Sequence, residues 1–260
     1  MCKKIVPVLL LSGLLSACLT SPTGRSQLIF MPDAQINQMG LQAFDTLKKE
    51  TPISRNSRYN QTASCIAQAL IKEVGGSWEV VVFEDKSPNA FALPGNKIGI
   101  HTGMLALVKT QDQLAAVIGH EIGHVLAKHS NERASQELAV NQGMALIQAV
   151  TTPQTALGQT AFGLLGVGAQ YGVLMPFSRT QESEADMIGV DLMARAGFDP
   201  KQSVTLWQLM AQATQGQQPL EFMSTHPAHA TRIQNLEQHM PQALGLYQQA
   251  QTAGKQPHCQ

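Results

Sequence analysis

Five consecutive residues, His120-Glu121-Ile122-Gly123-His124, combine the side chains that zinc-dependent hydrolysis needs. On a helix, histidines four residues apart project from one face about a turn apart, so both imidazoles can reach a single Zn²⁺. Glu121 lies beside them and can take a proton from water as that water attacks a peptide carbonyl. The motif predicts His120 and His124 as zinc ligands and Glu121 as the general base.

The residues around this motif favour a buried helix. The chain has eight His in 260 residues, so the five-residue pattern alone would arise by chance in roughly one such chain in a hundred. Thr110 and Gln113 are typical of a capping box, with Thr110 as N-cap and Gln113 reaching back. The apolar positions that follow have helical spacing: Leu114, Val117, Ile118, Ile122, Val125 and Leu126. The alternative is a solvated helix that carries two unrelated histidines.

A catalytic zinc site usually has three protein ligands, so a third must be found. The metzincin pattern would place Gly at position 127 and His at position 130, but the chain has Ala127 and Ser130. That subclass is excluded, and the third ligand is expected to be a Glu on a second helix. The segment that begins at Ser178 offers one, because Ser178 with Gln181 predicts another capping box.

Glu182 and Glu184 compete for the ligand role on that second helix. Glu182 and Asp186 are four residues apart on one face, so Asp186 can accept the N–H of a ligating His while Glu182 binds the metal. Glu184 points away from both. The spacing favours Glu182, the alternative being that the acidic run is an ordinary helix start.

Three segments together resemble one family. H-E-I-G-H, S-R-T-Q-E-S-E-A-D-M-I-G and T-H-P-A-H-A-T-R-I are similar to the zinc metallopeptidases that include HtpX, the CAAX prenyl proteases, BepA and LoiP, with the layout of the periplasmic lipoproteins among them. The resemblance runs from about Asp33 to Met240. It implies a mostly helical α+β fold of the zincin (gluzincin) type with a small β-sheet beside the active-site helix. It also implies one Zn²⁺ per chain held by His120, His124 and Glu182.

The resemblance further places His226 near the metal, where its imidazole would stabilise the oxyanion or block the open coordination site. Pro227 suits the first position of a helix, which would put His226 at that helix's N-terminus; the alternative is an exposed His in a capping loop. Arg232 on the same helix is expected to bind substrate or an acidic partner, or else to form a structural ion pair. The other histidines have no partner in the sequence and default to structural or surface roles: His101, His129, His229, His239 and His258.

The first residues predict a lipoprotein. Residues 1–17 have the charges and the short apolar run of a signal peptide, and Leu15-Ser16-Ala17-Cys18 is a lipobox. The run is too short to span a bilayer, so we expect cleavage and lipidation of Cys18, followed by a tether to residue 32. Leu19 after Cys18 favours, by resemblance to bacterial lipoproteins, the outer membrane facing the periplasm.

Cysteine usage agrees with that compartment. Once the signal is removed and Cys18 carries lipid, Cys65 and Cys259 remain in an oxidising space. They predict a disulfide between an early helix and the tail, residues 251–260, the alternative being two free thiols.

Residues 33–250 are expected to form one metallopeptidase domain. The formal net charge is zero and no basic cluster suggests nucleic acid. Helices are expected at 33–50 and 59–74, a strand at 78–84, and two strands at 89–93 and 97–101 around the turn Pro94-Gly95-Asn96. The apolar segment 156–177 is interrupted by glycines, which favours a buried helix or a gate over a membrane span.

An edge strand in this small sheet would pair with an extended peptide through backbone hydrogen bonds. The predicted substrate contacts are Asn89, Ala90, Phe91 and Ala92, the alternative being that the hairpin serves only to cover the zinc helix. These features predict a lipid-anchored endopeptidase of unfolded or misfolded envelope proteins, with possible outer-membrane assembly or protease partners. The rival hypothesis is a chaperone-like assembly factor whose zinc site seldom cleaves.

Overall fold

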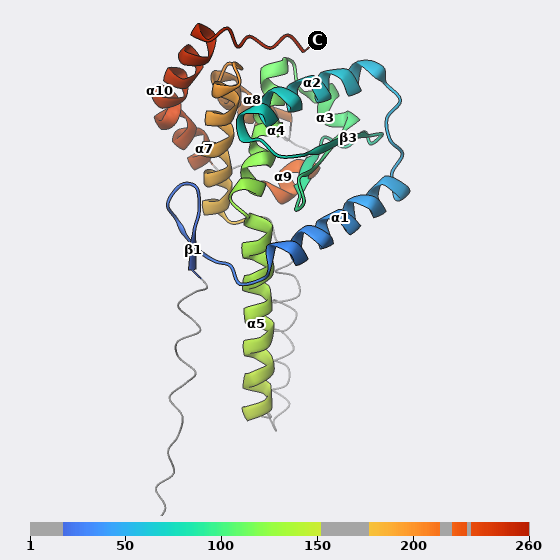
Figure 1. Ribbon diagram of the computed structural model, residues 1–260, viewed down its shortest axis with the longest axis vertical. Coiled ribbons are helices and arrows are strands. Elements are labelled where there is room, and N and C mark those ends of the chain that lie inside the picture. Colours follow the sequence, from blue (N-terminus) through green and yellow to red (C-terminus); the bar gives the residue numbers. More distant parts are fainter. Residues whose placement is uncertain (1–17, 152–176, 214–219, 228–229, 260) are drawn as a thin grey trace, which may run out of the picture. The chain divides into compact units, whose positions relative to one another are not determined.

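The computed structural model describes residues 18–151, 177–213, 220–227 and 230–259 (Figure 1). The described residues fall into two compact units. The smaller contains residues 18–32 and 131–151, and the larger contains 33–130 together with the described residues from 177 onward. The predicted signal peptide and nearly all of the apolar segment 156–177 lie outside the described residues.

The smaller unit contains a hairpin where the sequence suggested only a tether. Strands β1 (Cys18–Thr20) and β2 (Ser26–Leu28) pair antiparallel. Arg25 donates two hydrogen bonds to Glu132 on helix α5 (His129–Thr151), at 2.6 and 2.7 Å. Such a two-pronged guanidinium–carboxylate contact is stronger than a single hydrogen bond and fixes the geometry of both partners. It fastens the hairpin to this helix.

The larger unit has a three-stranded sheet in the order β3-β5-β4. Strand β3 (Glu79–Phe83) runs parallel to β5 (Lys97–His101), and β4 (Ala90–Leu93) runs antiparallel to it. The predicted turn joins β4 and β5, with Gly95 and Asn96 at φ 83° and 60°. Gly and Asn tolerate this left-handed conformation better than other residues. Because β5 is the central strand, β4 lies at one edge of the sheet.

Helices make up the rest of the larger unit. Its elements are α1 (Asp33–Glu50), α2 (Ser57–Val74), α3 (Thr102–Leu107), α4 (Gln111–Leu126), α7 (Arg179–Arg195), α8 (Lys201–Ala213), α9 (Glu221–Thr225) and α10 (Ala230–Thr252). The α+β class and the mostly helical fold agree with the prediction. Two differences concern the segment around Pro227. Helix α9 was not expected, and His226 caps its C-terminus instead of starting a helix.

Helix α4 lies in the core, where it contacts α2, α7, α8 and β4. Its residues 113–124 are all buried. Thr110 Oγ1 accepts the N–H of Gln113, as predicted, but the Gln113 side chain accepts from Lys109 rather than from Thr110. Figure 1 shows α4 beside α7 and α8. The motif residues are therefore carried by the most enclosed helix of this unit.

Glycines let the backbones of α4 and α7 touch. A Cβ atom added to Gly123 would lie 2.7 Å from the carbonyl oxygen of Ala185, and one added to Gly189 would lie 2.7 Å from the backbone nitrogen of His120. Both distances are too short for real carbon atoms. The close approach brings the acidic residues at the start of α7 within reach of the two histidines on α4.

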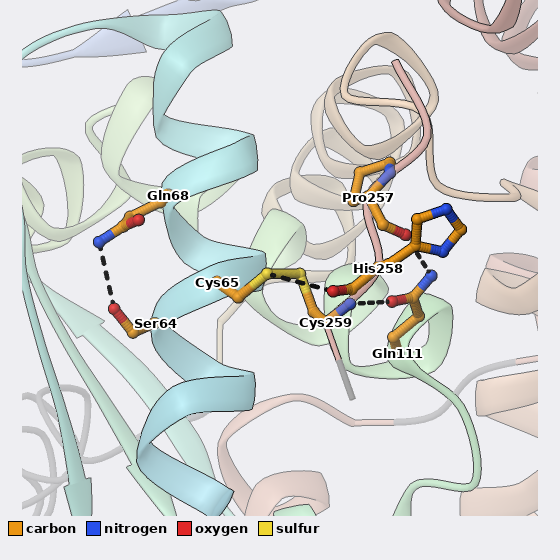
Figure 2. Close-up of a disulfide and its surroundings, with 7 residues drawn as sticks. All are labelled: Ser64, Cys65, Gln68, Gln111, Pro257, His258 and Cys259. Atoms are coloured by element: carbon orange, nitrogen blue, oxygen red, sulfur yellow. Dashed lines mark hydrogen bonds between the residues drawn. A yellow bond between two sulfur atoms is a disulfide. The ribbon is translucent and has the colours of Figure 1, made fainter. Parts of the chain in front are cut away.

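The C-terminal residues are fastened across the start of α4 (Figure 2). Cys65 on α2 forms a disulfide with Cys259, with Cα atoms 5.5 Å apart. Gln111 donates to the carbonyl of Pro257 at 2.8 Å, and its side-chain oxygen accepts the N–H of Cys259 at 2.7 Å. The tail is thus bound to two helices of the same unit. Among the helices described, none is both long and apolar enough to cross a membrane.

Candidate metal centre

Four buried side chains meet between α4, α7 and the end of α9. His120, His124, Glu182 and His226 each offer one ligand atom, and these atoms all lie within 4.8 Å of one another. The Nε2 atoms of His120 and His124 are 3.1 Å apart, and Glu182 Oε1 lies 3.4 Å from His124 Nε2. The packing of α4 against α7 thus brings Glu182 to His120 and His124, although it lies far from both in the sequence.

The donor set fits a zinc ion. Imidazole nitrogen and carboxylate oxygen are typical zinc ligands, and three protein ligands leave a position open for chemistry. Glu182 Oε2 is buried and accepts no hydrogen bond within the described part of the chain, although it faces His120 Nε2 at 3.5 Å. Hydrogen bonds from His120, His124 and His226 outweigh burial and hold the pKa of Glu182 far below its usual range. A fixed carboxylate charge among imidazoles suits a divalent cation.

Glu121 lies next to this cluster with its carboxylate only 2% exposed. Its Oε2 accepts the backbone N–H of Ala92 on β4 at 2.9 Å, and its Oε1 is 3.4 Å from His226 Nε2. Burial raises the pKa of Glu121. A raised pKa brings a carboxylate closer to the range in which it exchanges protons near neutral pH.

Asp186 stands behind His120. Its Oδ1 is 2.9 Å from His120 Nδ1, so the opposite ring nitrogen, Nε2, faces the cluster. Burial lowers the pKa of His120, but hydrogen bonds to Asp186 and Glu182 outweigh it and raise that pKa to about 9. A metal at Nε2 must therefore displace a proton, which makes binding weaker as the pH falls.

Arg232 is enclosed, at 1% exposure, and does not present its guanidinium to solvent. Its Nε and Nη2 donate to the two oxygens of Asp186, each at 2.7 Å, and its guanidinium lies 3.6 Å from the Trp207 ring. Its Nη1 is 2.5 Å from Glu182 Oε2 as an ion pair without the alignment of a hydrogen bond. Of the two predicted roles, these contacts support the structural ion pair, and a contact of Arg232 with substrate stays a prediction.

His226 is held between two aromatic rings. Its ring stacks on Phe222 with centroids 4.5 Å apart and on Phe177 at 5.4 Å. Its Nδ1 lies 3.0 Å from Glu182 Oε1 and 3.2 Å from His120 Nε2. This nitrogen therefore occupies a corner of the ligand cluster, whereas its Nε2 faces Glu121.

The predicted substrate contacts lie on β4, at the sheet edge nearest the cluster. Asn89 precedes the strand and donates to Glu221 on α9 at 2.9 Å, and Ala90 is fully buried. The Phe91 ring packs over Gly99 on β5. Ala92 is the one of the four that the structure joins directly to the candidate base.

A second group, Asp85, His101 and Glu221, also has metal-ligating side chains. Ordinary hydrogen bonds account for it. Asp85 accepts from the backbone and the hydroxyl of Ser87, Glu221 accepts from Asn89, and Ser87 Oγ is 3.1 Å from His101 Nδ1. His101 keeps the structural role expected of it.

Sequence reasoning missed His129 and Glu184. His129 Nδ1 is 2.9 Å from His124 Nδ1, and its Nε2 is 3.1 Å from Glu184 Oε2. Both side chains are buried, so the expectation that His129 lacks a partner is corrected. Two residues five positions apart do not project from the same face of a continuous helix. The signal was hidden by the break between α4 and α5, where Lys128 has φ 52°.

A motif helix crossed closely by a second helix that carries a glutamate, beside a small sheet whose edge strand contacts the candidate base, defines a zincin-type metallopeptidase. The comparisons with known proteins agree. The sequence model of the family described as "Peptidase family M48" matches residues 53–240, and the chain belongs to that family. Its members are zinc metallopeptidases, hydrolases of peptide bonds, and the cluster around His120 supplies donors for that ion.

Similar proteins have names that describe proteolytic activity. The chain is 41% identical over 193 residues to the mitochondrial metalloendopeptidase OMA1 of Schizosaccharomyces pombe, a match that covers 71% of this chain and 55% of that protein. It is 30% identical over 224 residues to metalloprotease LoiP of Escherichia coli, covering 85% and 87%. It is 26% identical over 206 residues to the beta-barrel assembly-enhancing protease of the same bacterium, covering 75% and 42%. The chain spans about half the length of the OMA1 proteins it matches.

Proposed function

We propose that this chain is a lipid-anchored zinc endopeptidase of the bacterial cell envelope that cleaves unfolded or damaged proteins. One observation carries the endopeptidase role: the edge strand β4 meets the candidate base, because the Ala92 N–H donates to Glu121 Oε2 at 2.9 Å. A peptide added to a sheet edge is held by its backbone, which gives affinity without demanding a sequence. An extended chain of any composition would thus lie beside the base.

The residues divide the chemistry among them. His120, His124 and Glu182 would hold the zinc, with Asp186 fixing the ring of His120. Zinc supplies the Lewis acidity that polarises a peptide carbonyl and activates water at neutral pH. Glu121 takes the proton of the attacking water and passes it to the leaving amine. Its burial, which raises its pKa, prepares it for that second step.

His226 is proposed as a latch on the fourth coordination position. Its Nδ1 lies among the ligand atoms, and the stacking of Phe177 and Phe222 holds the ring there. Cleavage then requires His226 to leave the metal. While Nδ1 occupies the fourth coordination position, it cannot donate a hydrogen bond to a developing oxyanion.

The envelope location is supported by sequence. Residues 1–18 carry the signal and lipobox pattern, and two similar proteins come from a bacterium, whereas the similar OMA1 proteins are named as mitochondrial. The lipid on Cys18 would be the membrane contact, with unfolded envelope proteins as substrates.

The test is digestion of an unfolded protein by the purified chain. We expect about one zinc per chain, cleavage of casein, loss of cleavage with chelator and recovery with zinc. Glu121→Gln should keep the zinc and lower cleavage by about two to four orders of magnitude, because it removes only the base. Glu237→Gln, an exposed residue of α10, is the matched control and should change neither. Loss of zinc in Glu121→Gln would show that Glu121 has another role.

A chaperone-like assembly factor is the second candidate, favoured by the enclosed position of His226 within the ligand cluster. In that case zinc would be bound, but neither the natural chain nor His226→Ala would cut casein.

A further inference from the structure

His129 lies against the candidate ligand His124, on the edge of the ring opposite to the metal cluster. His124 Nε2 faces His120 and Glu182, whereas its Nδ1 is 2.9 Å from His129 Nδ1. The two rings are nearly perpendicular, at 72°, with centroids 4.9 Å apart. His129 is 0% exposed. A buried imidazole must place both of its nitrogens in hydrogen bonds, and this one has a partner at each.

The proton positions in this chain of contacts follow from the metal. With zinc bound at Nε2, neutral His124 would carry its proton on Nδ1 and would donate it to His129 Nδ1. His129 then carries its own proton on Nε2 and donates it to Glu184 Oε2 at 3.1 Å. Glu184 is 5% exposed and accepts as a carboxylate. Each step fixes the tautomer of the next.

We propose that His129 and Glu184 form a positioning relay for the zinc ligand His124. The inference rests on the proposed zinc site and adds two residues to it. His120 has its carboxylate, Asp186, in direct contact. On the side of its ring away from the cluster, His124 contacts the imidazole of His129, which in turn contacts the carboxylate of Glu184. Both carboxylates, Glu184 and Asp186, lie on α7, one residue to either side of Ala185.

The corner between α4 and α5 makes the relay possible. Helix α4 ends at Leu126, and Ala127 and Lys128 turn the chain before α5 begins at His129. The left-handed conformation of Lys128 redirects the backbone. The fifth residue after His124 thereby returns to its ring. Such outer partners typically change metal affinity by about 10- to 100-fold.

The test measures how fast zinc leaves the full-length protein in the presence of a chromogenic chelator. His129→Leu keeps much of the volume but leaves the His124 N–H without an acceptor, so release should quicken by about 10- to 100-fold. His129→Asn should restore most of the slow release, because its amide oxygen can accept at the position of Nδ1. Glu184→Gln keeps the volume and an acceptor oxygen while removing the charge, and should fall between the two. With cobalt in place of zinc, the visible spectrum should change in His129→Leu and recover in His129→Asn.

The matched control is a second histidine–carboxylate pair, formed by His239 on α10 and Asp191 on α7. His239 Nε2 is 2.8 Å from Asp191 Oδ1, away from the cluster. His239→Leu and Asp191→Asn should lower the melting temperature without altering zinc release. Equal release rates in the natural chain, His129→Leu and Glu184→Gln would overturn the relay while the zinc site stands. A natural chain that binds no zinc would overturn the proposed function, and the relay with it. Should His129→Leu fail to fold, Glu184→Gln still decides, because a release rate equal to that of the natural chain would overturn the relay.

Discussion

At the scale of single residues, Arg232 is a buried cation that pairs with two carboxylates of the site. It is a fully enclosed cation whose charge is balanced by Asp186 and Glu182. Burial lowers its pKa, but the charge and hydrogen bonds of Asp186, together with the charges of Glu182 and Glu121, outweigh burial and raise that pKa. Burial in turn opposes the charge of Asp186, but Arg232 holds the pKa of Asp186 low. The cation therefore helps to keep the support of His120 ionised.

Replacing Arg232 by Met should destabilise the protein by about 3–5 kcal/mol, because removing one partner leaves a buried charge uncompensated. Urea unfolding with chelator present measures this apart from zinc binding. The control is Lys255→Met, which removes an exposed pair with Glu73 and should cost no more than about 1 kcal/mol. A similar cost for both variants would contradict the role given to Arg232.

At this scale sequence reasoning depended on spacing within one helix. His120 and His124 share one helix face, as do Glu182 and Asp186, and they were singled out for that reason, with Glu121 beside the first pair. His129 and Glu184 were not, because their meeting depends on a chain corner and on the packing of two helices. Arg232 lies at the right place in the sequence, but only packing shows that it is enclosed.

At the scale of elements, α9 links the sheet to the metal centre. It spans Glu221–Thr225, receives a hydrogen bond from Asn89 ahead of β4, and ends at His226. The Phe222 N–H also donates to the carbonyl of Pro88. A peptide that adds to β4 would approach the element that carries the proposed latch.

His226→Ala should raise casein cleavage with zinc retained, because it frees the fourth coordination position. The measurement is the initial rate at equal zinc content. If His226 were instead the oxyanion donor, the rate would fall by about two to three orders of magnitude. Phe222→Leu, which loosens one face of the ring without removing it, should move the rate in the same direction as His226→Ala but less.

Most elements could be predicted where a period or a turn signal is strong. Residues 33–50 and 97–101 have the predicted bounds, and α2 begins two residues earlier than expected because Asn56 caps it by accepting from Tyr59. Five-residue α9 is too short to show a period. The hairpin β1–β2 was read as a polar tether because its partner, Glu132, is more than 100 residues away in the sequence.

At the scale of the whole molecule, the proposed membrane attachment is the lipid on Cys18. Cys18→Ser should yield unprocessed or soluble protein, because the lipid is removed, and fractionation of cells with a high-salt wash measures this. A substitution two residues further on, Thr20→Ser, should leave the protein with the membrane. A processed Cys18→Ser variant that still pellets would assign the anchor to residues 156–177.

The disulfide should contribute to stability because it closes a long loop. Cys65→Ala with Cys259→Ala is expected to lower the free energy of unfolding by about 2–5 kcal/mol, since the unbridged unfolded chain gains freedom. Thermal unfolding checks this. Alkylation of both thiols without reductant in the natural chain would show that the bond is absent in solution.

The same bond has a topological consequence. Every residue assigned to the metal centre lies between positions 65 and 259, so all of them belong to one covalent ring of the chain. A single cut anywhere within that ring opens it without producing separate fragments. A nicked molecule would migrate as one species until it is reduced, and its ligands would remain tethered to one another. If another copy of the protease cut this chain once within the ring, the covalent connectivity would change, but no fragment would be released.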